Sequence, residues 1–147
     1  MTKRERLLWT LSWLIRLVVG ITFIVAAWPK IVHPDAFALS VYYYHMMPAS
    51  LLHAFALLVP WLEMVTGIAL IIGWGRRGAA LLVALLLLMF ILGLSTALAR
   101  GLDISCGCFG TDGGHAVGIS LLIRDVAMFL ALLLFLRIEK PKDRSEA

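Results

Sequence analysis

Two cysteines separated by one glycine are the residues of this chain best suited to chemistry. Cys106 and Cys108 are the only cysteines among 147 residues, and Gly107 lies between them. Thiolates are the nucleophiles of disulfide exchange and are also ligands for soft metal ions. The pair could therefore hold a static disulfide, pass a disulfide to another protein, or bind a metal ion.

The residues around the pair allow the bend that such a short disulfide requires. An extended backbone would hold the two Cα atoms near or beyond the roughly 6.8 Å that a disulfide tolerates. Gly107 can adopt the bend, and Gly110, which follows Phe109, gives the segment more freedom. We expect a strained disulfide, and strained disulfides are more oxidising than relaxed ones.

The two alternatives to redox exchange are weaker on physical grounds. A disulfide that closes so short a loop adds little stability, because the chain-entropy benefit grows with loop length. Cys106, Cys108 and His115 could bind a soft metal ion. A closed zinc site needs four ligands at recognised spacings, which this segment lacks, so we expect no metal. His115 could instead accept a proton from a thiol.

The elements that must position the pair are membrane helices. Of all residues 62% are hydrophobic, and the mean hydropathy is +0.96. Four apolar runs exceed the length of about 18 residues that indicates a membrane span; they cover residues 8–28, 51–74, 79–99 and 116–136. We predict one all-α domain, residues 1–139, folded as an antiparallel four-helix bundle, with a polar tail at 140–147. The first run is too long for a signal peptide, so we expect a retained helix.

The charges flanking the spans predict the topology. Nine basic residues would lie on one side of the membrane: Lys3, Arg4, Arg6, Arg76, Arg77, Arg137, Lys140, Lys142 and Arg144. Only Lys30 and Arg100 would lie on the other side. The positive-inside rule then makes both termini cytoplasmic and turns the cysteines outward, where disulfides persist. Most of the basic residues that give the net charge of +4 flank the spans. The positive charge therefore does not indicate a nucleic-acid partner.

The outer connection before the second span has its own predicted element. Residues 34–45 contain three consecutive tyrosines, Tyr42 to Tyr44, and Pro48 follows. Aromatic side chains favour the headgroup level of a bilayer. We predict a short helix that lies in the interface and ends before Pro48.

Four ionisable residues fall inside the predicted spans: Arg16, Glu63, Arg124 and Asp125. At about 1.5 Å per residue, Arg16 and Glu63 have depths that allow a salt bridge. Arg124 and Asp125 are adjacent in sequence, so they should point about 100° apart. The four form either a structural network or a polar site beneath the cysteines that handles protons or a quinone headgroup. In the second case Arg124 and Glu63 are the better candidates.

Several short motifs resemble one family of membrane proteins. They are Arg16 with Gly20, Trp-Pro-Lys-Ile at 28–31, Pro-Asp-Ala-Phe at 34–37, Tyr-His-Met-Met-Pro at 44–48, Pro-Trp-Leu-Glu at 60–63, Arg-Gly at 100–101, Cys-Gly-Cys-Phe-Gly at 106–110, and Arg124. Together they resemble the MauE family of methylamine-utilisation membrane proteins, within the wider DoxX-like group. The Arg-Gly and Cys-Gly-Cys-Phe-Gly segments are the most specific part.

The resemblance implies a four-helix membrane protein that serves the maturation of disulfide-rich periplasmic enzymes, with the small subunit of methylamine dehydrogenase as the expected client. It also suggests analogy to quinone-linked disulfide-forming membrane proteins. Those proteins usually carry a second cysteine pair, which this chain lacks. Electrons would therefore pass directly between Cys106/Cys108 and a cofactor or a partner protein.

We accordingly predict a multi-pass thiol–disulfide oxidoreductase of the bacterial inner membrane. Its partner would be a periplasmic thioredoxin-like or client protein. No cofactor would be covalently bound, and a quinone is the candidate acceptor. Gly20 and Gly93 permit close helix packing, so a homo-oligomer is compatible with the sequence. The alternative is a non-enzymatic assembly or metal-handling factor.

Overall fold

The described parts of the chain are helical and connected by short turns. The computed structural model describes residues 2–101 and 119–139. These contain five helices: α1 Lys3–Val32, α2 Pro34–Tyr43, α3 Ala49–Ile72, α4 Arg76–Ala99 and α5 Ile119–Ile138. All but α2 are long and apolar enough to cross a membrane. The predicted all-α class and the four spans are confirmed, and the polar tail at 140–147 lies outside the described residues.

The first helix is longer than the sequence predicts. Thr2 and Glu5 form a reciprocal capping box at its start, which satisfies backbone N–H groups of the first turn. The helix then continues past the expected end at residue 28, through Pro29, to Val32. A proline normally interrupts a helix because it lacks the N–H group and its ring clashes with the preceding turn. Here Pro29 lies in the last turn, and the helix beyond it turns Lys30 inward.

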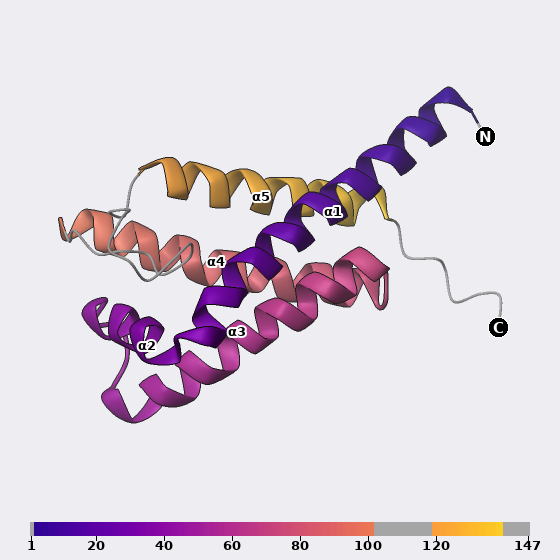
Figure 1. The fold of residues 1–147 in the computed structure, drawn as a ribbon. Coiled ribbons are helices and arrows are strands. Elements are labelled where there is room, and N and C mark those ends of the chain that lie inside the picture. Colours follow the sequence, from indigo (N-terminus) through magenta and orange to yellow (C-terminus); the bar gives the residue numbers. More distant parts are fainter. Residues whose placement is uncertain (1, 102–118, 140–147) are drawn as a thin grey trace.

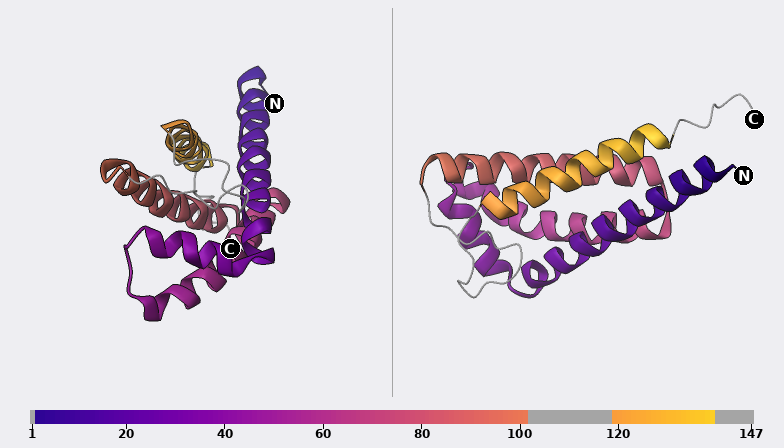
Figure 2. Two further views of the ribbon diagram at one scale, coloured as in Figure 1. Left: turned by 60° about the vertical axis from the view of Figure 1, so that its left-hand side comes forward. Right: turned by 90° about the horizontal axis from the view of Figure 1, so that it is seen from above.

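The helices pack as neighbours along much of their lengths. The largest contact is between α1 and α3, while α4 packs against both α3 and α5, and α2 packs mainly on α3. Figure 1 shows α2, the C-terminal end of α4 and the N-terminal end of α5 at one end of the molecule. The start of α1, the turn between α3 and α4 and the end of α5 lie at the other end, as the second view in Figure 2 also shows.

The packing of α1 on α3 depends on two glycines that face each other. A Cβ atom added to Gly20 would lie 2.9 Å from the carbonyl oxygen of Gly67, and one added to Gly67 would lie 2.9 Å from that of Gly20. These distances are too short for real Cβ atoms. The two backbones therefore touch, as at other close helix crossings in membranes. Gly93 is different, because a Cβ atom there would meet no atom within 4 Å.

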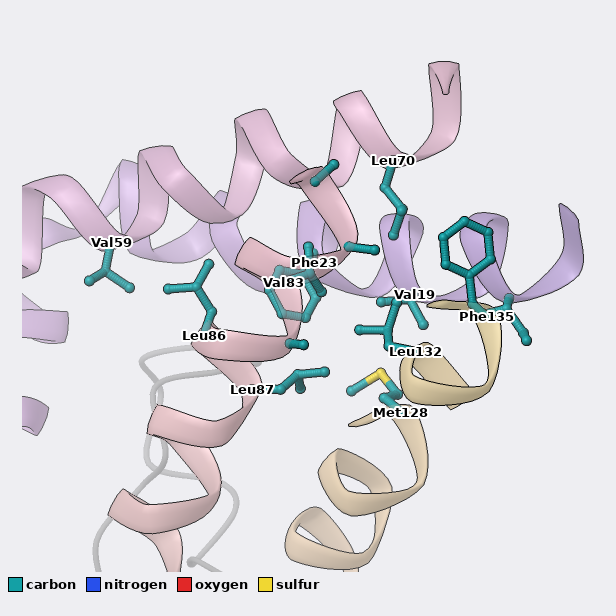
Figure 3. Packing of buried hydrophobic residues seen from close by; sticks show 14 of the residues in the cluster. Val19, Phe23, Val59, Leu70, Val83, Leu86, Leu87, Met128, Leu132 and Phe135 are labelled. Atoms are coloured by element: carbon teal, nitrogen blue, oxygen red, sulfur yellow. The ribbon is translucent and has the colours of Figure 1, made fainter. Parts of the chain in front are cut away.

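The core lies where the four long helices meet. Figure 3 shows Val19 and Phe23 of α1, Leu70 of α3, Val83 and Leu87 of α4, and Leu132 and Phe135 of α5 packed together. Large apolar side chains also cover the outward faces; Leu58, Leu85 and Leu130 are more than half exposed. An apolar outside is unfavourable in water and favourable in lipid, which fits four membrane spans.

Candidate functional site

The predicted redox motif falls outside the part of the chain that the structure describes. Residues 106–110, with both cysteines, and His115 belong to the stretch 102–118. That stretch joins α4 to α5 in the sequence, and the C-terminal end of α4 and the N-terminal end of α5 lie at the end of the molecule that carries α2 (Figure 1).

A buried ion pair inside the bundle involves a lysine that sequence analysis placed in a loop. The Lys30 ammonium donates to both carboxylate oxygens of Glu63, at 2.8 and 2.9 Å. Both residues are only 1% exposed. Lys30 lies on the same buried face of α1 as Phe23 and Ala27. Their spacing of three to four residues is the sequence signal from which the burial of Lys30 could have been predicted. Lys30 therefore no longer counts among the basic residues of the outer loops that were used to predict the topology.

Two aromatic rings complete the surroundings of this ammonium group. The Lys30 Nζ lies 5.1 Å from the ring centre of Phe37 in α2 and 4.7 Å from that of Phe90 in α4. A cation near the face of a ring is stabilised by the ring's quadrupole, and the effect grows when water is excluded. The ammonium therefore links α1 to α2, α3 and α4.

A second ion pair lies in α5. The guanidinium of Arg124 donates through Nε and Nη2 to Asp125 Oδ1, at 3.0 and 2.8 Å. The expectation that the two side chains point apart was wrong, because the long arginine side chain bends back to its neighbour. Asp125 is 2% exposed, whereas the Arg124 side chain is 31% exposed.

The two ion pairs face one small cavity. Lys30, Glu63, Arg124 and Asp125 all line a space of about 20 Å³ between α1, α3, α4 and α5. That volume is enough for one water molecule, which is stable only with several polar partners. Two positive and two negative charges thus share one polar centre in the interior of the bundle.

Arg16 does not belong to this centre, contrary to the salt bridge with Glu63 that the depth estimate allowed. Its Nε donates to the Leu70 carbonyl at 2.8 Å and its Nη2 to the Ile71 carbonyl at 2.9 Å. The last four carbonyls of a helix have no intrahelical donor, so Arg16 caps α3. The similar depths of Arg16 and Glu63 in the membrane were not enough to predict a salt bridge, because depth does not show which way each side chain points from its helix.

This capping role predicts a stability effect. Arg16→Met should lower the free energy of unfolding by about 1.5–3 kcal/mol, because two carbonyls lose a charged donor. Thermal unfolding in detergent measures the change. Arg77→Met removes an equivalent charge at an exposed position of the α3–α4 hairpin and should stay within about 0.5 kcal/mol. Equal effects of the two substitutions would contradict the capping role.

A larger apolar cavity adjoins the ion pair at the same end as α2. It has a volume of about 180 Å³ and lies between α2, α3 and α4. Phe37 and Phe90, the two rings beside Lys30, also line it. We call this space the aromatic chamber.

Metal ligands do not gather in the described part of the chain. Within residues 2–101 and 119–139, no three His, Asp or Glu side chains are grouped so that they could hold an ion. The candidate metal ligands Cys106, Cys108 and His115 lie outside these residues.

Comparisons with known proteins single out one family. The family described as "Methylamine utilisation protein MauE" matches residues 8–137. Proteins named methylamine utilization protein MauE are similar: the one from Methylophilus methylotrophus is 35% identical over 67% of this chain, and the one from Paracoccus denitrificans 28% identical over 91%. The one from Methylorubrum extorquens is 30% identical over 72% of this chain.

The relatives are longer than the matched segment. The matches span 53% of the Methylophilus protein, 74% of the Paracoccus protein and 58% of the Methylorubrum protein. The chain thus covers little more than half of two of these relatives. No solved structure matches it significantly.

Proposed function

This chain belongs to the MauE family of methylamine utilisation proteins, and from that premise we propose that it is a membrane accessory protein that exchanges disulfides on the outer face. Four apolar helices and bacterial relatives make it a multi-pass bacterial membrane protein. The observation that carries the proposal is the Cys106-Gly107-Cys108 motif, which joins two membrane helices and contains all the cysteines of the chain.

The proposed exchange moves two electrons between two proteins. A client thiolate attacks one sulfur of the Cys106–Cys108 disulfide and forms a mixed disulfide, while the other sulfur leaves as a thiolate. A second client thiolate then attacks the client sulfur of the mixed disulfide and releases the remaining cysteine. The client gains a disulfide, and the pair takes up two electrons and two protons. A periplasmic thioredoxin-like protein or a maturing enzyme would be the partner, with the methylamine dehydrogenase small subunit as the expected client.

The reduced pair needs an acceptor, because the chain has no further cysteines. A quinone, when bound, would accept two electrons and two protons. The protein's own contribution would be to hold the acceptor beside the segment that carries the pair and to exclude water from it. The aromatic chamber supports this assignment, since it is apolar and its lining includes Gly93 and Leu94, near the C-terminal end of α4.

We propose that the four long helices form an antiparallel bundle in the membrane and that both termini lie in the cytoplasm. Removing Lys30 from the outer charges leaves only Arg100 as a basic residue of the outer connections, which strengthens the asymmetry. In this orientation α2 lies at the outer interface. Its Phe37 is buried against the bundle, while Tyr42 and Tyr43 are exposed, as expected for aromatic anchors at headgroup level.

In this proposal the polar centre has a structural role. Its two ion pairs come from α1, α3 and α5, and Phe90 of α4 contacts the Lys30 ammonium. Buried charges in a membrane are unfavourable unless paired, and these pairs balance to zero. We propose that they hold the helices that flank the cysteine segment in one arrangement.

Thiol trapping tests the proposed function. Cells that express the full chain are quenched with acid and treated with an alkylating reagent that adds mass to free thiols. The wild-type cysteine pair should change from the oxidised to the reduced form as the ratio of reduced to oxidised glutathione is raised. Cys106→Ser and Cys108→Ser should each abolish the shift and the formation of client disulfides.

Ser105→Ala is the matched control, because it changes the neighbouring residue without touching a thiol. It should leave the shift and the client unchanged. Normal client maturation in both cysteine variants would overturn the redox function. Stoichiometric zinc or copper on the purified reduced protein would favour the assembly or metal-handling alternative instead.

A further inference from the structure

The N-terminal part of α1 projects away from the bundle. Arg16 donates to the carbonyls of Leu70 and Ile71, so it lies beside the end of α3. Residues 3–14 of α1 extend past that end, and none of them is buried. Figures 1 and 2 show this part of α1 reaching beyond the turn between α3 and α4. We call residues 3–14 the projecting segment; at about 1.5 Å per residue its length is about 18 Å.

The projecting segment combines exposed apolar side chains with basic ones. Leu7 is 68% exposed and Trp9 65% exposed. A contiguous apolar surface of this kind marks a site of contact with a membrane or with another molecule. Lys3, Arg4 and Arg6 precede the apolar residues. Basic residues together with leucine and tryptophan are typical of helices that rest at the boundary between headgroups and acyl chains.

Positive charge gathers at this end of the molecule. The carboxylates of the described residues in the three segments that meet here are Glu5 and Glu139. The basic residues are Lys3, Arg4 and Arg6 at the start of α1, Arg76 and Arg77 at the start of α4, and Arg137 in the last turn of α5. This surplus of positive charge attracts an anionic partner.

Two arginines approach each other over the turn that ends α3. A Cβ atom added to Gly73 would lie 2.5 Å from Arg16 Nη2 and 3.3 Å from Arg76 Nε, so both guanidinium groups border the same point. Like charges at short range repel each other. The carboxylate of Glu139, 3.2 Å from the Arg76 guanidinium, offsets only one of the two charges. An anion at this point would be attracted by both arginines, and a guanidinium group matches the oxygens of a phosphate.

We propose that the angle between the projecting segment and the α3–α4 turn binds one anionic phospholipid. Its phosphate contacts Arg76, whose side chain is 52% exposed, and lies within the field of Arg16. Trp74 is 82% exposed next to this turn, as expected for a side chain at headgroup level. The projecting segment flanks the lipid on its other side. Basic pockets between membrane helices recognise anionic headgroups in the same way.

Native mass spectrometry of the purified full chain in detergent tests this site. The probe is dioleoyl phosphatidylglycerol, and dioleoyl phosphatidylcholine is the lipid with the same chains and no net charge. The wild type should retain one phosphatidylglycerol molecule in preference to phosphatidylcholine. Arg76→Met should bind phosphatidylglycerol about fivefold more weakly, because one basic residue near an anionic headgroup contributes about that factor. Equal affinity of Arg76→Met and the wild type would overturn the proposal.

Two further variants separate this site from a general effect of charge. Arg100→Met removes the same charge near the C-terminal end of α4, at the opposite end of the molecule, and should leave the affinity unchanged. Glu139→Gln should tighten binding, because the carboxylate that competes with the phosphate for Arg76 is removed. If Arg100→Met weakened binding as much as Arg76→Met, or if Glu139→Gln weakened it, the site would be wrong.

Other occupants give different results in the same measurement. Inorganic phosphate at the concentration of the lipid should not displace it; displacement would mean that the turn binds a simple anion, and would overturn the lipid site. A stable dimer that retains no phosphatidylglycerol would assign the projecting segment to a second copy of the chain, with the same consequence. Binding in detergent requires neither the cysteine pair nor a particular orientation. A negative result would therefore leave the proposed redox function intact, and failure of that function would leave the lipid site intact.

Discussion

Glu63→Gln should lower the free energy of unfolding by about 3–5 kcal/mol, because it removes the carboxylate that forms an ion pair with the buried Lys30 ammonium. The ammonium now lies 2.8 Å from a carboxylate oxygen, and both residues are 1% exposed. Glutamine keeps the volume and one acceptor oxygen, so the loss would report the charge and not a cavity. Denaturant unfolding in detergent, followed by tryptophan fluorescence, measures it.

Removing the other partner by Lys30→Met should be about as destabilising, since the buried Glu63 carboxylate then loses the ammonium that pairs with it. The double variant Lys30→Met/Glu63→Met should be more stable than either single variant, because neither charge remains and the volume is kept. Additive losses in this cycle would show that the two side chains are not coupled.

An exposed ion pair provides the control for this cycle. Arg76 and Glu139 lie 3.2 Å apart, and the Arg76 side chain is 52% exposed. Arg76→Met should change the free energy of unfolding by no more than about 1 kcal/mol, since exposed pairs are screened by solvent. A loss as large as that of Glu63→Gln would mean that burial does not explain the difference.

Gly67→Ala should destabilise the protein by about 1–3 kcal/mol, although alanine is the better helix former. The new Cβ atom would lie 2.9 Å from the backbone oxygen of Gly20 and 3.2 Å from Phe23 Cβ. A backbone oxygen cannot rotate away, so α1 and α3 must move apart along their interface. The loss should appear as a lower midpoint of thermal unfolding in detergent.

The control for this substitution has the opposite expected sign. A Cβ atom at Gly78 in α4 would meet nothing within 4 Å, so Gly78→Ala should stabilise the protein by up to about 1 kcal/mol through helix propensity alone. Gly67→Leu should be more damaging than Gly67→Ala. If Gly67→Ala and Gly78→Ala shift stability in the same direction, the close contact of α1 and α3 is wrong.

The buried charges show where sequence reasoning stopped. Glu63, Arg124 and Asp125 were recognised because ionisable residues are rare in membrane helices, and the structure places all three around one cavity. Their partners were not predictable. Lys30 follows Pro29 near the end of an apolar run. A basic residue in a loop at the membrane boundary would have the same sequence context. Arg16 has a similar estimated depth to Glu63 but faces the end of α3.

The sequence by itself determined the four membrane helices, the family and the candidate redox pair, because each is encoded locally. A span needs only an uninterrupted apolar run, and Cys106-Gly107-Cys108 is contiguous. The tertiary structure decided which charges meet and where the aromatic chamber opens, since both depend on how each helix is rotated and where it crosses its neighbours. That rotation is set by contacts between distant residues, such as Gly20 with Gly67 and Lys30 with Glu63.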